Sequence, residues 1–137
     1  MTAAEKEFFQ KFHFSPEEAR ARFESARRDL RIAEKDPFPE VRFTYAYQAL
    51  IKTGTALLAG EGLKVRSIPG HHVKILEKMS ELLSDADILT LGNAMRMKRN
   101  QDLYGTGELI SDKESREYLA FVQSVLNRTE GRKRGLS

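Results

Sequence analysis

Residues 15–35 read SPEEARARFESARRDLRIAEK and carry the strongest folding signal in the chain. Ser15 is a favoured N-cap residue, Pro16 is favoured at the first helical position, and Glu18 completes a capping box. Apolar residues then recur at steps of three and four, which predicts an amphipathic helix. Its buried stripe should consist of Ala19, Phe23, Ala26, Leu30 and Ala33. Residues 36–39 contain two prolines and should end this helix, because proline disfavours helical backbone in the residue before it.

Helical patterns continue on both sides of this segment, and no segment shows the alternation of a strand. We expect helices over residues 3–12, 16–35, 38–59, 71–83, 85–103 and 112–129, with a loop over 63–70. Ser84 with Asp87 and Ser111 with Glu114 resemble further capping boxes. Gly54 lies inside a predicted helix at a cost of roughly 1 kcal/mol against alanine, which indicates close packing of a neighbouring helix. The chain is therefore predicted to be all-α, an up-and-down bundle of four to five helices.

The composition is that of one small domain. A chain of 137 residues fits a single domain, which we place at residues 1–130, followed by a basic tail at 131–137. The absence of cysteine excludes a disulfide framework, a thiolate zinc site and cysteine nucleophile chemistry. No apolar run approaches the roughly 18 residues of a membrane span, and the N-terminus lacks the layout of a signal peptide. We therefore expect a cytoplasmic protein that does not enter a membrane.

The three histidines do not form a metal-binding pattern. His71 and His72 are adjacent at the start of a predicted helix, so their side chains point in different directions and make a poor chelate. His72 is expected to lean on the bundle and His71 to face solvent. The chain also lacks a glycine-rich phosphate loop and a paired-carboxylate signature. We expect neither a metal nor a cofactor.

The most informative polar segment ends the helix over 85–103. The buried side of that helix should carry Ile88, Leu91, Ala94, Met95 and Lys98. Arg96, Asn100 and Tyr104 follow one another at steps of four and share another face, with Arg99 beside them. The helix macrodipole favours cations at a C-terminus, which is a purely structural explanation for Arg96, Lys98 and Arg99. The functional alternative is a phosphate site, in which arginine supplies a fork of donors and the amide and phenol supply single hydrogen bonds.

The segment from Arg99 to Gly105 resembles the motif region of the HEPN superfamily, because Arg99 and Asn100 are followed at a short spacing by Tyr104 near a helix end. The Tyr- and Ala-rich residues 45–63, the loop after them and the histidine at the start of the next helix resemble that family as well. The last predicted helix is also similar. The resemblance covers about residues 16–128.

This resemblance implies a HEPN-like bundle that forms a homodimer. Many HEPN proteins are metal-independent ribonucleases of toxin–antitoxin or defence systems, and others are partners of small nucleotidyltransferases. Carried over to this chain, the catalytic residues would be Arg99, Asn100 and Tyr104. The residues that bind phosphate or nucleic acid would be Arg96, Lys98 and Arg99.

Position 104 holds the one departure from the family motif, which has histidine there. RNA cleavage without a metal needs a general base for the ribose 2′-hydroxyl. An imidazole titrates near neutral pH, whereas the phenol of Tyr104 titrates near 10. The expectation is therefore an RNA- or nucleotide-binding protein in which any ribonuclease activity is degenerate.

A second interpretation belongs to another class. The chain would then be a non-catalytic interaction module that binds a nucleotidyltransferase or another protein, and Arg99 would pair locally with Asp102. An open cleft that holds Arg99, Asn100 and Tyr104 would favour binding or catalysis. A buried Tyr104 beside an internally paired Arg99 would favour the interaction module.

Overall fold

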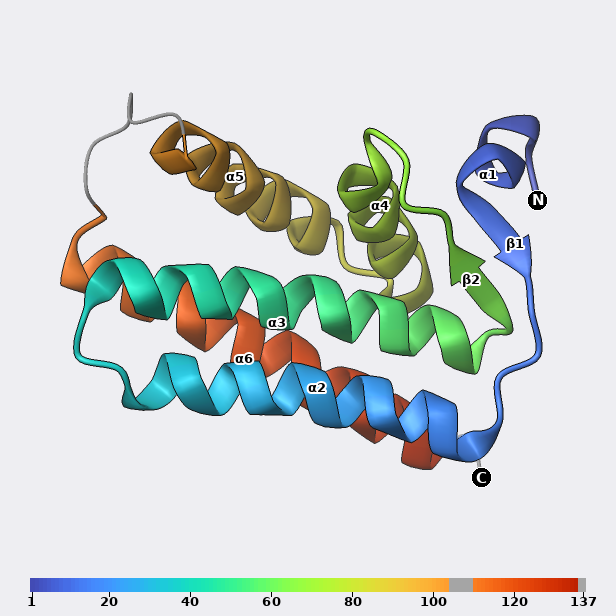
Figure 1. The fold of residues 1–137 in the computed structure, drawn as a ribbon, viewed down its shortest axis with the longest axis horizontal. Helices are drawn as coiled ribbons and strands as arrows, with labels where there is room; N and C mark the ends of the chain where they lie inside the picture. Colours follow the sequence, from blue (N-terminus) through green and yellow to red (C-terminus); the bar gives the residue numbers. More distant parts are fainter. Residues whose placement is uncertain (104–109, 136–137) are drawn as a thin grey trace.

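The chain is mostly helical in the computed structural model, which describes residues 1–103 and 110–135 (Figure 1). In chain order the elements of these two ranges are α1 (Ala3–Phe8), β1 (Phe9–Lys11), α2 (Pro16–Lys35), α3 (Pro39–Gly60), β2 (Leu63–Val65), α4 (His71–Leu83), α5 (Ala86–Leu103) and α6 (Asp112–Gly135). The predicted all-α class is confirmed. No helix in the described ranges is long and apolar enough to cross a membrane.

Helix α3 is the centre of the fold. It packs against α2 and α6 on one side and against α4 and α5 on another, while α1 and both strands lie beyond its C-terminal end (Figure 1). Because neighbours surround it, α3 is buried along most of its length. The largest fully buried apolar side chains are Phe9, Phe43, Tyr47, Leu50, Leu58, Ile75, Leu76, Met79, Ile88, Met95 and Leu126. They form one continuous core that holds α4 and α5 against α3.

The two short strands correct the prediction of a helix over 3–12 and of a plain loop over 63–70. Helix α1 ends at Phe8, and β1 pairs antiparallel with β2 so that Phe9 lies opposite Val65. The Phe9 side chain is buried, and the pairing satisfies backbone groups that a lone segment would leave to water. Gly62 adopts a positive φ of 72° and turns the chain from α3 into β2.

The helix starts follow the capping signals in two of three cases. The hydroxyl of Ser15 accepts from the Glu18 amide, and the Glu18 carboxylate accepts from the Ser15 amide. Ser111 likewise caps α6. The predicted box at Ser84 is wrong, because Ser84 has a φ of 51° and ends α4. The next residue, Asp85, caps the start of α5 instead: its carboxylate accepts a hydrogen bond from the Asp87 amide at 3.0 Å.

Helix α5 is rotated from its predicted orientation, and this rotation places the candidate site. Gly92 is buried with Ile88 and Met95, whereas Leu91 is 37% exposed and Ala94 is exposed. A Cβ atom built on Gly92 would lie 2.6 Å from Leu76 Cδ2, so α5 approaches α4 through its glycine. The apolar pattern misses this contact because glycine has no side chain to count. The rotation turns Arg96 and Asn100 toward α4.

Helix α6 continues well beyond its predicted end near residue 129. It runs to Gly135 and therefore includes most of the segment that the sequence presents as a basic tail. Arg132 forms an ion pair with Glu61 at 2.8 Å, which joins this last turn of α6 to the end of α3. The helix gains a tertiary partner there that local sequence patterns do not reveal.

Candidate functional site

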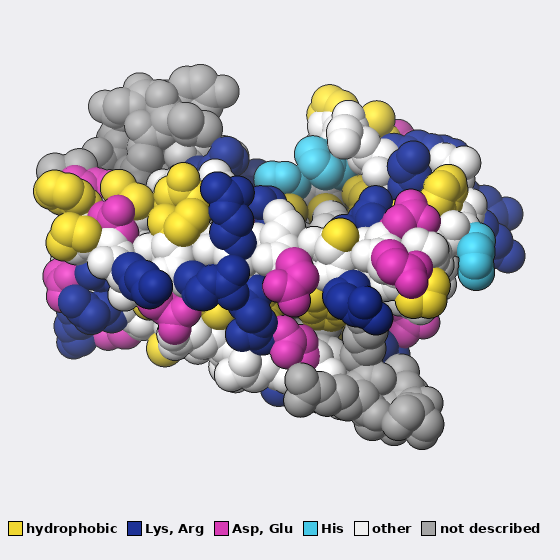
Figure 2. Space-filling view, turned by 60° about the horizontal axis from the view of Figure 1, so that its bottom comes forward, with side chains coloured by type: hydrophobic (Ala, Val, Ile, Leu, Met, Phe, Trp, Pro, Cys, Tyr) yellow, Lys and Arg dark blue, Asp and Glu magenta, His cyan; other side chains and the backbone are white. Residues whose placement is uncertain are grey.

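An open cleft of about 430 Å³ lies between the start of α4 and the second half of α5. Residues 67–70 form one wall, and His71 and His72 follow at the first turn of α4. Arg96 and Asn100 line it from α5, and among residues 1–103 and 110–135 none of those that line the cleft is acidic. Figure 2 shows a hollow on one face of the molecule with histidine side chains in it and Lys or Arg side chains at its edge. The cleft is therefore a basic, solvent-open feature.

His71 is held in a defined tautomer by the loop before α4. Its Nδ1 lies 2.8 Å from the carbonyl oxygen of Ile68. A carbonyl oxygen only accepts hydrogen bonds, so Nδ1 carries the proton and donates it. In the neutral imidazole, Nε2 then carries the free lone pair. His71 thus offers a hydrogen-bond acceptor, or a base, to the cleft it lines.

His72 is held by a buried tyrosine that sequence patterns assign only to the core. The hydroxyl of Tyr47 lies 2.8 Å from His72 Nδ1, and Tyr47 is 1% exposed. Burial raises the pKa of Tyr47 to about 12, although Arg99 and Arg96 act in the opposite direction. The phenol therefore keeps its proton. We assign it as the donor to His72 Nδ1, because donation satisfies the only proton of a buried hydroxyl.

The same environment keeps His72 neutral. Burial lowers the pKa of His72 to about 4, and electrostatic repulsion between protonated His72 and its neighbours His71 and Arg99 acts in the same direction. With Nδ1 accepting from Tyr47, the ring proton lies on Nε2. The adjacent rings of His71 and His72, 4.5 Å apart between centroids, therefore present one free acceptor and one N–H donor.

The charged residues of α5 divide between the cleft and other contacts. Arg96 lines the cleft, and its Nε donates to Asn93 at 2.9 Å. The guanidinium of Arg99 lies over the ring of Tyr47, 5.5 Å from the centroid, in a cation–π contact. Lys98 is not among the residues that line the cleft and forms an ion pair with Glu114 of α6 at 2.9 Å.

The structure thus brings together three of the sequence-predicted site residues. Arg96 and Asn100 line the cleft, and Arg99 stacks on Tyr47, whose hydroxyl bonds to His72 of the cleft. Tyr104 lies outside the described residues. No group of three or more His, Asp or Glu side chains suited to a metal ion occurs in residues 1–103 and 110–135.

The start of α4 adds positive potential to the cleft. Its N-cap is Gly70, which supplies no side-chain acceptor, and its first turn contains no acid. The His71 amide donates to the Ile68 carbonyl at 3.1 Å, whereas the other amides of a first helical turn lack partners within the helix, and the macrodipole places partial positive charge there. Together with Arg96 they make this end of α4 attractive to an anion.

Sequence reasoning missed Tyr47 and undervalued both histidines. Tyr47 fits the apolar stripe of its helix, and its hydroxyl meets His72 only through the packing of α4 on α3. The expectation that His72 leans on the bundle is confirmed, whereas His71 is half-buried and lines the cleft. The available signal was a histidine pair directly after a Pro-Gly turn, at the positive end of a helix.

We expect His72 to lower the free energy of unfolding when the solution becomes mildly acidic. The unfolded chain protonates this histidine near pH 6.5, whereas the folded protein does so only near 4. Stability should therefore fall as pH drops through this window, by about 1 to 2 kcal/mol because solvent screens a half-buried ring. Urea unfolding at neutral pH and at about pH 5 measures the effect. His72→Asn keeps an acceptor for Tyr47 but does not titrate, so the stability of this variant should depend less on pH. An equal pH dependence in wild type and variant would contradict the role given to His72.

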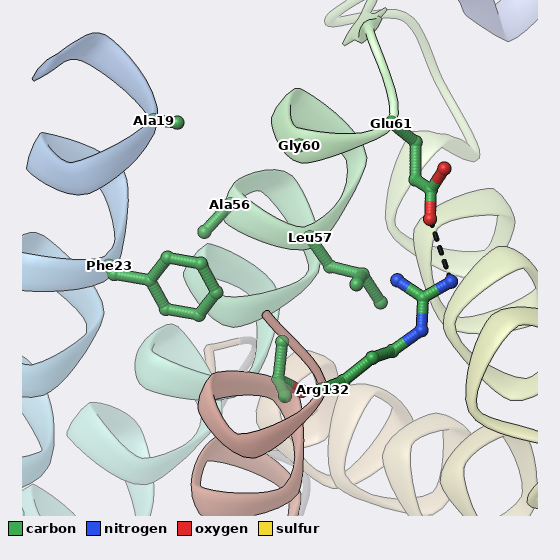
Figure 3. Close-up of a pocket in the computed structure, with 8 residues that line it drawn as sticks. Ala19, Phe23, Ala56, Leu57, Gly60, Glu61 and Arg132 are labelled. Carbon is green, nitrogen blue, oxygen red and sulfur yellow. Dashed lines mark ion pairs between the residues drawn. The ribbon is translucent and has the colours of Figure 1, made fainter. Parts of the chain in front are cut away.

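A second cavity, of about 130 Å³, lies between α2, α3 and α6 (Figure 3). Phe23, Ala56 and Leu57 give it a mostly apolar wall, and the Glu61–Arg132 ion pair lies at its edge. It is small for a ligand site, and its charged groups already neutralise each other. The cleft between α4 and α5 is the stronger candidate, since no acidic residue is among the described residues that line it.

Comparisons of the chain with protein-family models, with curated proteins and with solved structures gave no match. The resemblance to HEPN proteins therefore stays a prediction from the motif residues. What this cleft does must be inferred from the side chains and backbone groups that form it.

Proposed function

We propose that the protein binds RNA, and that the cleft between α4 and α5 holds the phosphates of the RNA backbone. The observation that carries the proposal is the convergence of Arg96, two imidazoles and the start of α4, which has no side-chain cap, in one open cleft where the described part of the chain places no acid. Each of these groups is a recurrent partner of phosphate oxygens. The amide of Asn100 adds a donor and an acceptor beside them.

The shape of the cleft supports a polymer over a free nucleotide. Single-stranded nucleic acids bind in positively charged grooves that follow the backbone, whereas small ligands are mostly enclosed. This cleft opens to solvent and is bounded by one loop and two helices. In a homodimer of the kind that the HEPN resemblance implies, two such clefts would double the positive charge available to one RNA.

Arg96→Gln should weaken RNA binding about tenfold, because it removes a charged donor from the cleft but keeps a polar side chain. The slope of log affinity against log salt should also fall by about 0.7 for a single strand. Fluorescence anisotropy with a labelled single-stranded RNA in EDTA measures both quantities. Arg20→Gln is the matched control, because Arg20 is exposed on α2 and outside the cleft.

The two variants separate local binding from general charge attraction. If Arg96→Gln and Arg20→Gln weaken RNA binding equally, the affinity depends only on the net charge of the protein. That result would overturn the proposal. Absence of binding by the wild-type protein would overturn it as well. An unchanged affinity in Arg20→Gln beside a tenfold loss in Arg96→Gln would support it.

The second candidate function is a non-catalytic interaction module, for which α5 supplies a specific observation. Leu91 and Met97 are 37% and 52% exposed on its outward face, and Ala94 is exposed between them. Such an apolar strip suits a second copy of the chain or a partner protein such as a nucleotidyltransferase. A wild-type protein that does not bind RNA would leave this candidate as the better one.

A further inference from the structure

The histidine pair has a chemical arrangement that phosphate binding alone does not require. Resting on the proposed RNA-binding function, we infer that His71 is the general base of a metal-independent RNA cleavage in this cleft. His72 and Arg96 would hold the phosphate. The base would thus come from the start of α4, not from position 104, where the chain has tyrosine.

The geometry of His71 suits proton abstraction. Its Nδ1 donates to the Ile68 carbonyl at 2.8 Å, which fixes the ring and leaves the lone pair on Nε2. A base positioned by a hydrogen bond from its other nitrogen is the arrangement that general-base histidines use. The Ile68 carbonyl is itself held, because residues 66–70 are anchored to the N-terminal segment by the Arg66 amide, which donates to Phe8 at 2.8 Å.

His72 is suited to a different part of the reaction. Its Nδ1 accepts from Tyr47 at 2.8 Å, so its Nε2 carries a proton and has no lone pair to offer. It can donate to a non-bridging phosphate oxygen. The two rings are neighbours, so a phosphate held by His72 and Arg96 would lie beside the base.

The reaction that these groups support is an intramolecular transesterification. His71 Nε2 takes the proton of the ribose 2′-hydroxyl, and the 2′-oxygen forms a bond to phosphorus. The bond from phosphorus to the 5′-oxygen breaks, and that oxygen takes a proton from water. The hydroxide formed takes the proton back from His71, which restores the base. The products are a 2′,3′-cyclic phosphate and a 5′-hydroxyl. The reaction requires no metal ion, oxidant or reductant.

The test compares cleavage and binding in the same full-length proteins. A labelled single-stranded RNA is incubated in EDTA with wild type, His71→Ala, His71→Gln and His13→Ala, and the products are separated on a gel. His13 is exposed and outside the cleft, so it is the matched control. We expect both His71 variants to lose about 100-fold or more in rate and the His13 variant to lose nothing. Affinity by anisotropy should fall by no more than about tenfold in the His71 variants, far less than the rate, because Arg96 and His72 still hold the phosphate. Circular dichroism shows that each variant folds.

Two further readouts are specific to a base. Added imidazole should restore part of the rate of His71→Ala, which a merely structural role would not allow. An RNA with 2′-O-methyl groups should bind and resist cleavage. Equal cleavage by wild type and His71→Ala, or cleavage of the 2′-O-methyl RNA, would overturn the inference. A wild type that binds RNA without cleaving it would overturn the inference alone, whereas a wild type that does neither would overturn the proposed function as well.

Discussion

Gly54→Val is expected to lower the free energy of unfolding by about 2 to 3 kcal/mol, because it places a branched side chain where α3 and α4 are in close contact. A Cβ atom on Gly54 would lie 2.7 Å from the Met79 sulfur and would overlap the side chain of Ile75. Both neighbours are fully buried, and protein cores are packed so densely that a displaced side chain disturbs those around it. Urea unfolding followed by circular dichroism measures the loss. Under the proposed function, displacement of α4 should also weaken RNA binding, since α4 carries both cleft histidines.

Gly60→Ala is the matched control, six residues farther along the same helix. A Cβ atom at Gly60 would meet nothing within 4 Å. Alanine restricts the unfolded chain more than glycine does, so this variant should be as stable as wild type or up to about 1 kcal/mol more stable. Similar destabilisation by both substitutions would show that close helix packing is not the cause.

Arg42→Ala is expected to cost about 3 kcal/mol, because Arg42 is a buried junction between three helix ends. The side chain is 2% exposed, and one guanidinium nitrogen donates to Asp112 and Ser115, both at 2.8 Å. The other terminal nitrogen donates to the carbonyl of Asp36 at 3.1 Å. Truncation would remove these charged hydrogen bonds and leave a cavity in their place. Urea unfolding again gives the value.

Arg116 offers a control that shares the same carboxylate. It pairs with Asp112 at 2.8 Å, but its side chain is 62% exposed. An exposed ion pair contributes about 0 to 1 kcal/mol, so Arg116→Ala should change stability little. Losses of the same size in Arg42→Ala and Arg116→Ala would show that burial of the Arg42 network is not what matters.

The helices could be predicted from sequence because their signals are local. The capping box at Ser15 and the apolar period after it lie within one segment, and the structure begins and ends α2 where they indicate. Gly54 is a similar case, since a glycine inside a helix already implies a close neighbour. The β1–β2 pairing could not be predicted in this way. It joins segments far apart in the chain, and neither has a strand pattern of its own.

Only part of the candidate site could be predicted from the sequence, for the same reason. Arg96, Arg99 and Asn100 form a pattern on one helix, so the sequence indicates them together. Tyr47 reaches His72 from another helix, and the tautomer of His71 depends on a loop carbonyl. The orientation of α5 depends on a glycine that fits against Leu76. Such relations arise only when helices pack, and hydrophobic periodicity contains no information about them.

The β1–β2 ribbon has a consequence for the order in which the molecule folds. The α2–α3 hairpin joins neighbours in the chain and can close early, whereas Phe9 must meet Val65 across both of these helices. Closing so long a loop costs chain entropy before any contact compensates for it. The loop that carries Ile68 is tied to this ribbon through Arg66 and Phe8. During refolding, helical structure should therefore appear before the cleft acquires its final form.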